Sequence, residues 1–255
     1  MLRISKYVLF DITRGKVIIG YTLFLLLVSF SLFNLETESA KAMLSLLNIM
    51  LIVVPLISMV FSTIHYYNSY EFVELMMAQP VSRTKIILAE YAGTSLSLVL
   101  AFLVGVGVPM CIYNFTETGI SLVVTGSLLT LAFCSLAFLA SVNSKDKARG
   151  IGVVLLLWFY FALIYDGLIL LILFSFSDYP LEKLTLFLSS LNPIDLGRIA
   201  VMLKMDVSAL MGYTGATYKD FFGSALGTLY TAGIMILWIF VPLFFAVRIF
   251  RKKDM

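Results

Sequence analysis

The chain has 255 residues, of which 61% are apolar and only 13% charged, whereas soluble globular domains carry about 25% charged residues. This composition excludes a soluble domain and predicts an integral membrane protein. The net charge of +3 is small and the basic residues are dispersed, so nucleic acid is not an expected ligand. Both cysteines, Cys111 and Cys134, lie inside apolar runs and imply no disulfide framework.

Residues 1–16 combine an apolar helical face with basic residues suited to phospholipid head groups, which predicts an N-terminal interfacial helix. The apolar face carries Ile4, Tyr7, Val8 and Ile12, and the basic residues are Arg3, Lys6 and Arg14. The alternative is a disordered basic leader. A cleaved signal peptide is not expected, because the apolar run that follows is 17 residues long and exceeds the usual h-region of about 7 to 15.

Six apolar runs are long enough to cross the hydrocarbon core of a bilayer, which takes about 20 helical residues. They are residues 17–33, 43–64, 86–113, 120–142, 151–176 and 222–247. Their apolar character is continuous rather than alternating, which favours helices over a barrel. The sequence therefore predicts one all-α transmembrane domain over residues 1–255, with kinks at Pro55, Pro109 and Pro242.

The basic residues divide unequally between the two sides of the membrane. If the N-terminus is cytoplasmic, all but five of the 18 lysines and arginines fall on the inner side. The five outer ones are Lys41, Lys183, Arg198, Lys204 and Lys219. Four of these lie in one long segment, where charge bias has the least influence on orientation. The positive-inside rule thus predicts that both termini are cytoplasmic.

Residues 70–90, between the second and third spans, hold the sequence YEFVELMMAQPVSRTKIILAE. One helical face carries Phe72, Leu75, Met76 and Gln79, and another carries Glu71 and Glu74. We predict a short helix, half buried and half offered to a cytoplasmic partner, that ends at Pro80. Ser82 is positioned to cap the next helix, which begins at Arg83 and enters the membrane. The alternative is a solvated connecting loop.

Residues 177–221 form a long outer segment with its own helical pattern. Asn192-Pro193 is typical of an N-cap followed by proline at the first helical position. An apolar stripe of Leu196, Ile199, Ala200 and Leu203 lies opposite the polar residues Asp195, Arg198 and Lys204. This pattern predicts an amphipathic helix lying at the outer surface. Met202, Met205 and Met211 suggest either a soft-metal site or apolar packing, and packing is favoured because the segment has no cysteine or histidine.

The sequence contains few motifs that indicate catalysis or ligand binding. It has no GxxxxGK[ST] phosphate loop, so ATP has to be handled by a partner. The single histidine, His65, lies at the inner end of the second span and is interpreted as an interfacial anchor. Asp166 is the only charged residue deep in an apolar run, so it either faces a pathway, a partner helix or a dimer axis, or lies near the outer interface beside Gly167. No metal site is predicted.

Six spans, an interfacial N-terminal helix and Glu74-Leu75 ahead of Gln79-Pro80-x-x-Arg83 resemble the permease subunits of type-2 ABC exporters. The outer motifs Asn192-Pro193-Ile194-Asp195-x-x-Arg198 and Met211-Gly212-Tyr213-Thr214-Gly215-Ala216 are similar to those of the NosY family, the permeases of the nitrous oxide reductase maturation exporter. The resemblance implies a bacterial inner-membrane homodimer. It also implies a cytoplasmic ATPase dimer that binds ATP and magnesium, and a periplasmic β-helical accessory protein. The complex would support assembly of the reductase's copper-sulfide centre.

The resemblance also assigns roles to two groups of residues. The ATPase-coupling group is Glu71, Glu74, Leu75, Gln79, Pro80 and Arg83, and the surface for the accessory protein is Asn192, Pro193, Asp195, Arg198, Met211, Gly212, Tyr213 and Gly215. This chain itself would be no enzyme and bind no cofactor. Two alternatives remain: a type-2 exporter of a lipid, peptide or drug, and an ion-coupled secondary transporter that uses Asp166. The absence of an evident inverted repeat disfavours the second alternative.

Overall fold

A computed structural model describes residues 2–36, 38–176, 187–205 and 225–252, and every regular element in these ranges is a helix. Six of the helical segments are long and apolar enough to cross a membrane: Lys16–Leu35, Ser39–Asn68, Arg83–Tyr113, Glu117–Asn143, Lys147–Ile172 and Gly227–Lys252. The predicted all-α membrane fold with six spans is confirmed. The helices continue a few residues past the apolar runs, because helical hydrogen bonding persists into the polar interface.

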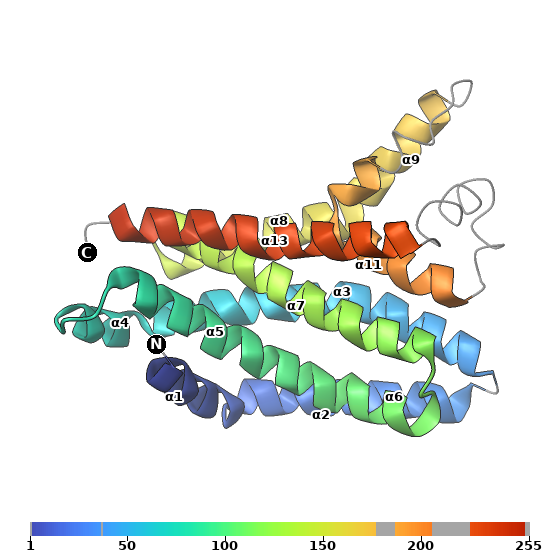
Figure 1. Cartoon of the computed structure of the whole chain (residues 1–255), viewed down its shortest axis with the longest axis horizontal. Coiled ribbons are helices and arrows are strands. Elements are labelled where there is room, and N and C mark those ends of the chain that lie inside the picture. The colour runs from blue at the N-terminus through green and yellow to red at the C-terminus, as the bar shows by residue number, and fades with distance from the viewer. Residues whose placement is uncertain (1, 37, 177–186, 206–224, 253–255) are drawn as a thin grey trace.

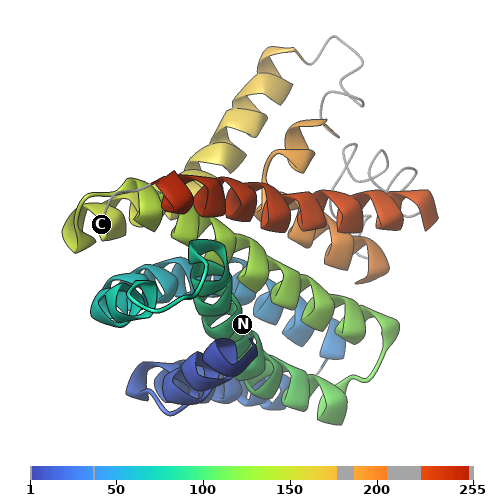
Figure 2. The same cartoon turned by 60° about the vertical axis from the view of Figure 1, so that its left-hand side comes forward.

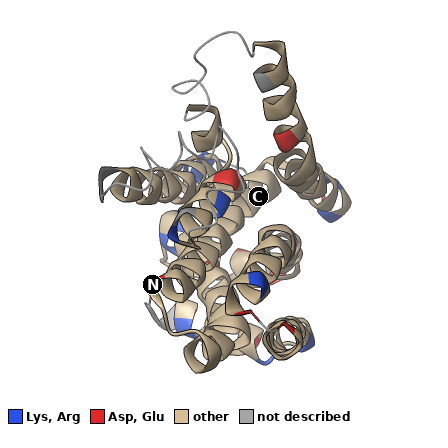
Figure 3. Cartoon of the chain, turned by 90° about the vertical axis from the view of Figure 1, so that its right-hand side faces the viewer, with Lys and Arg blue, Asp and Glu red and all other residues tan. Residues whose placement is uncertain are grey.

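The spans lie side by side along the long axis of the molecule, apart from the second half of the fifth span (Figure 1). They are α2 (Lys16–Leu35), α3 (Ser39–Asn68), α5 (Arg83–Phe102) with α6 (Val108–Tyr113), α7 (Glu117–Asn143), α8 (Lys147–Phe159) with α9 (Tyr165–Ser175), and α13 (Ala225–Lys252). The short helix α4 (Tyr70–Met77) lies at the same end of the bundle as α1 (Leu2–Thr13) and the C-terminal end of α13. Viewed end-on, most of the ribbon is uncharged, as lipid contact requires (Figure 3).

The centre of the bundle is α7, which packs against α3, α5, α11 (Pro193–Met202) and α13. Small residues allow this close approach. At Gly126 a Cβ atom would overlap the ring of Phe102, which is fully buried, and would lie 2.8 Å from Met50 Sδ. Glycine therefore fits where two neighbouring helices both reach α7.

The N-terminal helix α1 packs along α5, around Gly93 and Ser97. Val8 and Ile12 are buried there, and a Cβ atom at Gly93 would lie 2.5 Å from Val8 Cγ1. The hydroxyl of Ser97 donates to the carbonyl of Leu9 at 3.4 Å. The predicted helix is present. Tyr7, however, is 66% exposed and does not share the buried face, because α1 contacts α5 through Val8 and Ile12.

Two π-helical stretches interrupt the spans. The first, Leu103–Gly107, precedes Pro109 at the start of α6, where the sequence predicted a kink; Pro55 and Pro242 lie within the continuous helices α3 and α13. The second, Tyr160–Ile164, joins α8 to α9. Beyond it α9 departs from the bundle in both side views (Figures 1 and 2). π-Bulges commonly cause sharp helix bends, which accounts for this departure.

Candidate functional site

The helix α4 offers one face to solvent and holds the other against the chain. Val73 is 5% exposed, and the ring of Phe72 stacks on Tyr7 of α1 with centroids 6.1 Å apart. Glu71 and Glu74 are exposed, and Leu75 is 69% exposed. The expected position of Leu75 on the Phe72 face is therefore wrong, since Val73 takes the buried position. The solvent-facing set contains two carboxylates and one large apolar side chain.

The stretch after α4 turns the chain back into the bundle. The helix ends at Met77, and Gln79 and Pro80 lie exposed in the turn, so Gln79 is not on a helical face as predicted. Ser82 occupies the N-cap position of α5 with extended backbone, but its side chain makes no capping hydrogen bond. Arg83 begins α5, and its Nη1 donates to the carbonyl of Arg251 in α13 at 3.4 Å. This contact joins the third and sixth spans at the end of the bundle where α4 lies.

At the opposite half of the bundle, α11 begins at a buried cap. The Oδ1 of Asn192 accepts from the backbone N–H of Ile194 at 3.0 Å, with Pro193 at the first helical position, which confirms the predicted N-cap. The Nδ2 of Asn192 donates to the carbonyl of Phe161 at 3.0 Å. Phe161 belongs to the second π stretch, where the backbone carbonyls lack regular α-helical partners. One side chain thus ties α11 to the bend in the fifth span.

The predicted position of α11 at the outer surface is wrong. The helix packs among α3, α7 and α13, and Asn192, Pro193 and Asp195 are all buried. A Cβ atom at Gly197 would lie 3.0 Å from Thr125 Cγ2 and would also contact Leu129, so the helix runs alongside the N-terminal half of α7. An amphipathic stripe identifies one buried face, but here the neighbouring helices cover the polar face as well.

Beyond α11 the chain reaches the N-terminal end of α7. Lys204, in a 3-10 turn at Leu203–Met205, places its Nζ 2.6 Å from Glu117 Oε1, and the hydroxyl of Thr118 donates to the carbonyl of Lys204 at 3.0 Å. Met202 and Met205 pack partly buried against the hydrophobic core, as expected for apolar packing. The other candidate residues of the outer segment, Met211, Gly212, Tyr213 and Gly215, lie outside the described residues.

Asp166, Asp195 and Arg198 form a cluster that we call the outer ion-pair junction. The Nη1 of Arg198 lies 2.9 Å from Asp166 Oδ2 and 3.6 Å from Asp195 Oδ1. Asp166 lies in the first turn of α9, so the junction joins α9 to α11. Its carboxylate is paired with a guanidinium on a neighbouring helix of the same chain, which offsets the cost of placing a charge in a span. The role of Asp166 at a pathway or dimer axis stays a prediction.

Asp195 is the most buried member of the junction. It is 7% exposed, and its Oδ2 has no hydrogen-bond partner among the described residues. Burial and the adjacent Asp166 carboxylate raise the pKa of Asp195 to about 7, against the opposing effects of Arg198 and Asn192. The junction therefore holds two carboxyl groups and one cation in a site where a carboxyl group takes up a proton readily.

A second buried charge was missed by sequence reasoning. Glu90 in α5 is 3% exposed, and its Oε2 lies 3.1 Å from Nε2 of His65 in α3; the hydroxyl of Ser69 lies 3.2 Å from the same nitrogen. His65 is thus a partner of a buried carboxylate rather than an interfacial anchor, and Asp166 is not the only charge within a span. The available signal was a glutamate four residues inside a predicted span, with the only histidine of the sequence next to the end of the preceding span.

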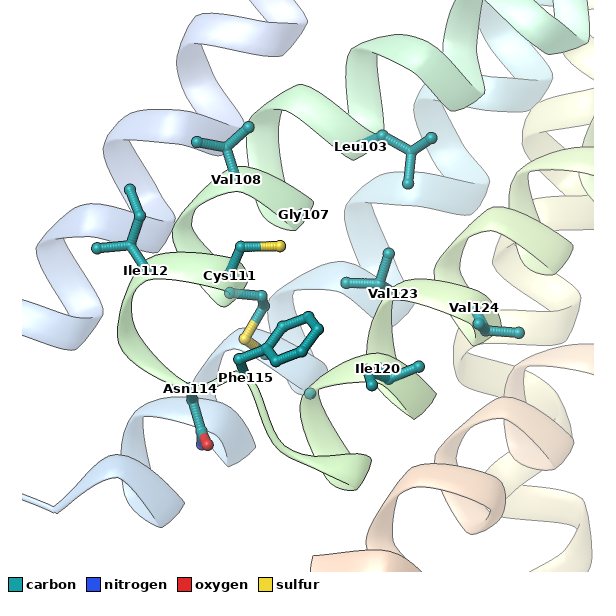
Figure 4. A pocket seen from close by; sticks show the side chains of 12 residues that line it. Leu103, Gly107, Val108, Cys111, Ile112, Asn114, Phe115, Ile120, Val123 and Val124 are labelled. Carbon is teal, nitrogen blue, oxygen red and sulfur yellow. The ribbon is translucent and has the colours of Figure 1, made fainter.

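An apolar pocket of about 410 Å³ lies between α6 and α7 (Figure 4). Leu103, Ile112, Phe115 and Val123 line it together with the exposed Cys111. The amide of Asn114 donates to Met43 Sδ at 2.7 Å. No charged residue lines the pocket, so it suits an acyl chain or another apolar group.

Comparisons with known proteins agree with this architecture. The model of the family described as "ABC-2 family transporter protein" matches residues 72–255. Two relatives carry the description "Probable ABC transporter permease protein NosY". The one from Stutzerimonas stutzeri is 28% identical over 201 residues, and the one from Pseudomonas aeruginosa is 30% identical over 189 residues. Each match covers 70% of this chain and 67% of the relative.

Proposed function

The chain belongs to the ABC-2 family of transporter proteins and is an ABC transporter permease subunit similar to NosY; from this premise we propose that it couples a partner ATPase to events at the outer face of the membrane. The observation that carries the proposal is the geometry of α4. Glu71, Glu74 and Leu75 face solvent, whereas Phe72 and Val73 pack against the chain. A partner that moves α4 would therefore move α1 and α5 with it.

The contacts of α5 and α7 offer a route from α4 to the outer half of the bundle. The hydroxyl of Tyr91 in α5 donates to the carbonyl of Leu131 in α7, and Ser135 of α7 donates to the same hydroxyl at 3.0 Å. Further out, α7 packs on Gly197 of α11, next to the outer ion-pair junction. A displacement of α7 would change the environment of that junction. ATP binding on the partner would in this way bias a two-state membrane element.

The finer function follows from the similarity to NosY. We propose that the chain works as a homodimer in a bacterial inner membrane, with both termini cytoplasmic, and that ATP and magnesium are bound by a separate ATPase dimer. An outer accessory protein of β-helical fold would meet the outer end of the junction. The work done there would support copper-sulfide centre assembly in nitrous oxide reductase. Purifying the tagged chain in mild detergent and identifying the co-eluting proteins tests these partners.

The coupling role is tested in complexes reconstituted with the ATPase. We expect Glu74→Ala and Leu75→Ala to uncouple ATP hydrolysis from the response at the outer face while the melting temperature stays unchanged, because both side chains are exposed. Glu36→Ala is the matched control, since Glu36 is an exposed carboxylate in the turn between the first two spans. Unchanged coupling in both α4 variants would refute the role of α4.

The alternative of a type-2 exporter for a lipid, peptide or drug is favoured by the apolar pocket between α6 and α7. It predicts ATPase activity that amphiphiles stimulate in a complex without an outer partner. The secondary-transporter alternative uses Asp166, but that carboxylate is paired with Arg198 at 2.9 Å. Transport driven by a pH gradient without nucleotide, and abolished by Asp166→Asn, would support it.

A further inference from the structure

A second pocket, of about 280 Å³, lies at the elbow where α1 meets α2, far in the fold from the pocket of Figure 4. Its wall is the C-terminal part of α3, from Ile57 to Asn68. Four residues with polar side chains line it: Asp11 and Lys16 beside the elbow, and His65 and Asn68 near the end of α3. The remaining lining is apolar except for Gly15. The pocket is therefore amphiphilic, with its polar residues at the α1–α2 elbow and at the end of α3.

The dimensions of this elbow pocket fit half a bilayer. Asn68 lies eleven residues after Ile57, so the α3 wall is about 16 Å long at 1.5 Å per residue. A single leaflet contributes about 15 Å of the 30 Å hydrocarbon core. Ile57, Phe61 and Ile64 line the apolar part of this wall. One acyl chain laid along α3 would match that length and keep its head group at the elbow.

The charges in the pocket specify the head group. The Asn68 amide oxygen already accepts from Lys147 Nζ at 2.8 Å, and the Nε2 of His65 faces Glu90. Asp11 and Lys16 are exposed, and neither forms an ion pair with another described residue. One anion and one cation at the same mouth complement a ligand that carries an ammonium and a phosphate.

We infer that the elbow pocket binds a zwitterionic phospholipid with a primary amine, of the phosphatidylethanolamine type. Lys16 faces the phosphate and Asp11 faces the ammonium, whose N–H groups donate charge-assisted hydrogen bonds. A choline head group carries the same charges but no N–H donor, and a glycerol head group carries no cation for Asp11. The site lies away from the solvent-facing set of α4, so it does not depend on the proposed function.

Native mass spectrometry of the delipidated full chain tests the inference. The protein is incubated with ethanolamine, choline and glycerol phospholipids of identical acyl chains, and the retained lipid adducts are counted. We expect the ethanolamine lipid to be retained about tenfold better than the choline lipid, as the loss of a charge-assisted hydrogen bond predicts. Lys16→Gln should lower the retention of all three lipids, because each carries a phosphate, and Asp11→Asn should remove this preference. Lys41→Gln, which neutralises an exposed lysine near the start of α3, should preserve it.

Three results would overturn the inference. Equal retention of the three lipids would show that only non-selective lipid surrounds the elbow, and a preference for the glycerol lipid would show that Asp11 plays no part. The same spectra report the oligomeric mass. If Asp11→Asn and Lys16→Gln dissociate an oligomer without changing lipid retention, the elbow pocket faces a second copy of the chain. Equal melting temperatures of the variants and the parent chain would exclude misfolding as the cause of any loss.

Discussion

The buried amide of Asn192 caps α11 with one hydrogen bond and joins it to the fifth span with another, so its removal has a calculable cost. Asn192→Ala removes the N-cap of α11, which costs about 1 kcal/mol. It also leaves the buried carbonyl of Phe161 without its donor, which costs about 1 to 3 kcal/mol. Together these losses favour undocking of α11 by about 2 to 4 kcal/mol, equivalent to at least about a 30-fold shift in the docking equilibrium.

Hydrogen–deuterium exchange of residues 193–202 measures this shift directly, because local opening exposes the backbone amides of α11. We expect Asn192→Ala to lower the protection of these amides by about 30-fold or more while the inner half of α7 remains protected. Asn192→Asp separates the two bonds, since a carboxylate keeps the cap acceptor and loses the donor to Phe161. Because this buried carboxylate oxygen would face the carbonyl oxygen of Phe161, the effect should be at least as large as that of Asn192→Ala.

Asn143→Ala is the matched control for this experiment. Its amide is exposed and donates to the carbonyl of Leu139 in its own helix at 3.1 Å, so its loss leaves no buried group unsatisfied. We expect that change to alter the protection of α11 by less than about twofold. Unchanged protection of α11 in Asn192→Ala, or an equal loss in the two alanine variants, would refute the assignment of Asn192 as the tie between α11 and the fifth span.

Three further predictions concern the junction, the core and the orientation of the chain. Because the pKa of Asp195 is raised to about 7, the folded chain holds this proton more tightly than the unfolded chain, so the stabilisation is complete below about pH 4 and is lost as the pH rises to about 7. Melting temperature measured across this range should fall for the parent chain and fall less for Asp195→Asn; equal slopes would contradict the assignment. Gly126→Val should destabilise the chain by about 1 to 3 kcal/mol through overpacking. Gly233→Ala should not destabilise it, because nothing lies within 4 Å of a Cβ at that position. Equal thermal stability of the two variants would count against the close packing on α7. In a background without the exposed cysteine, an impermeant maleimide should label Glu36→Cys in intact cells and Lys145→Cys only after permeabilisation, and the reverse pattern would invert the topology.

The helices followed from local properties of the sequence. A run of apolar residues that is long enough to cross a bilayer has to be helical, because no other local structure satisfies its backbone in lipid. The cap at Asn192-Pro193 was equally predictable, since it involves only neighbouring residues. The prediction correctly divided residues 70–90 into a short helix and a returning span. It was wrong about the buried face of α4, which contains Val73 rather than Leu75. With only two turns, a helix has too few residues for its periodicity to fix the rotation.

The tertiary structure alone decided which residues meet across the bundle. Arg198 and Asp166 are 32 positions apart, and His65 and Glu90 are 25 apart, so neither pair leaves a local pattern in the sequence. The burial of α11 has the same origin. Its apolar stripe indicated one buried face, but the number of helices around it depends on how closely α7 can approach Gly197, and that depends on packing between distant segments.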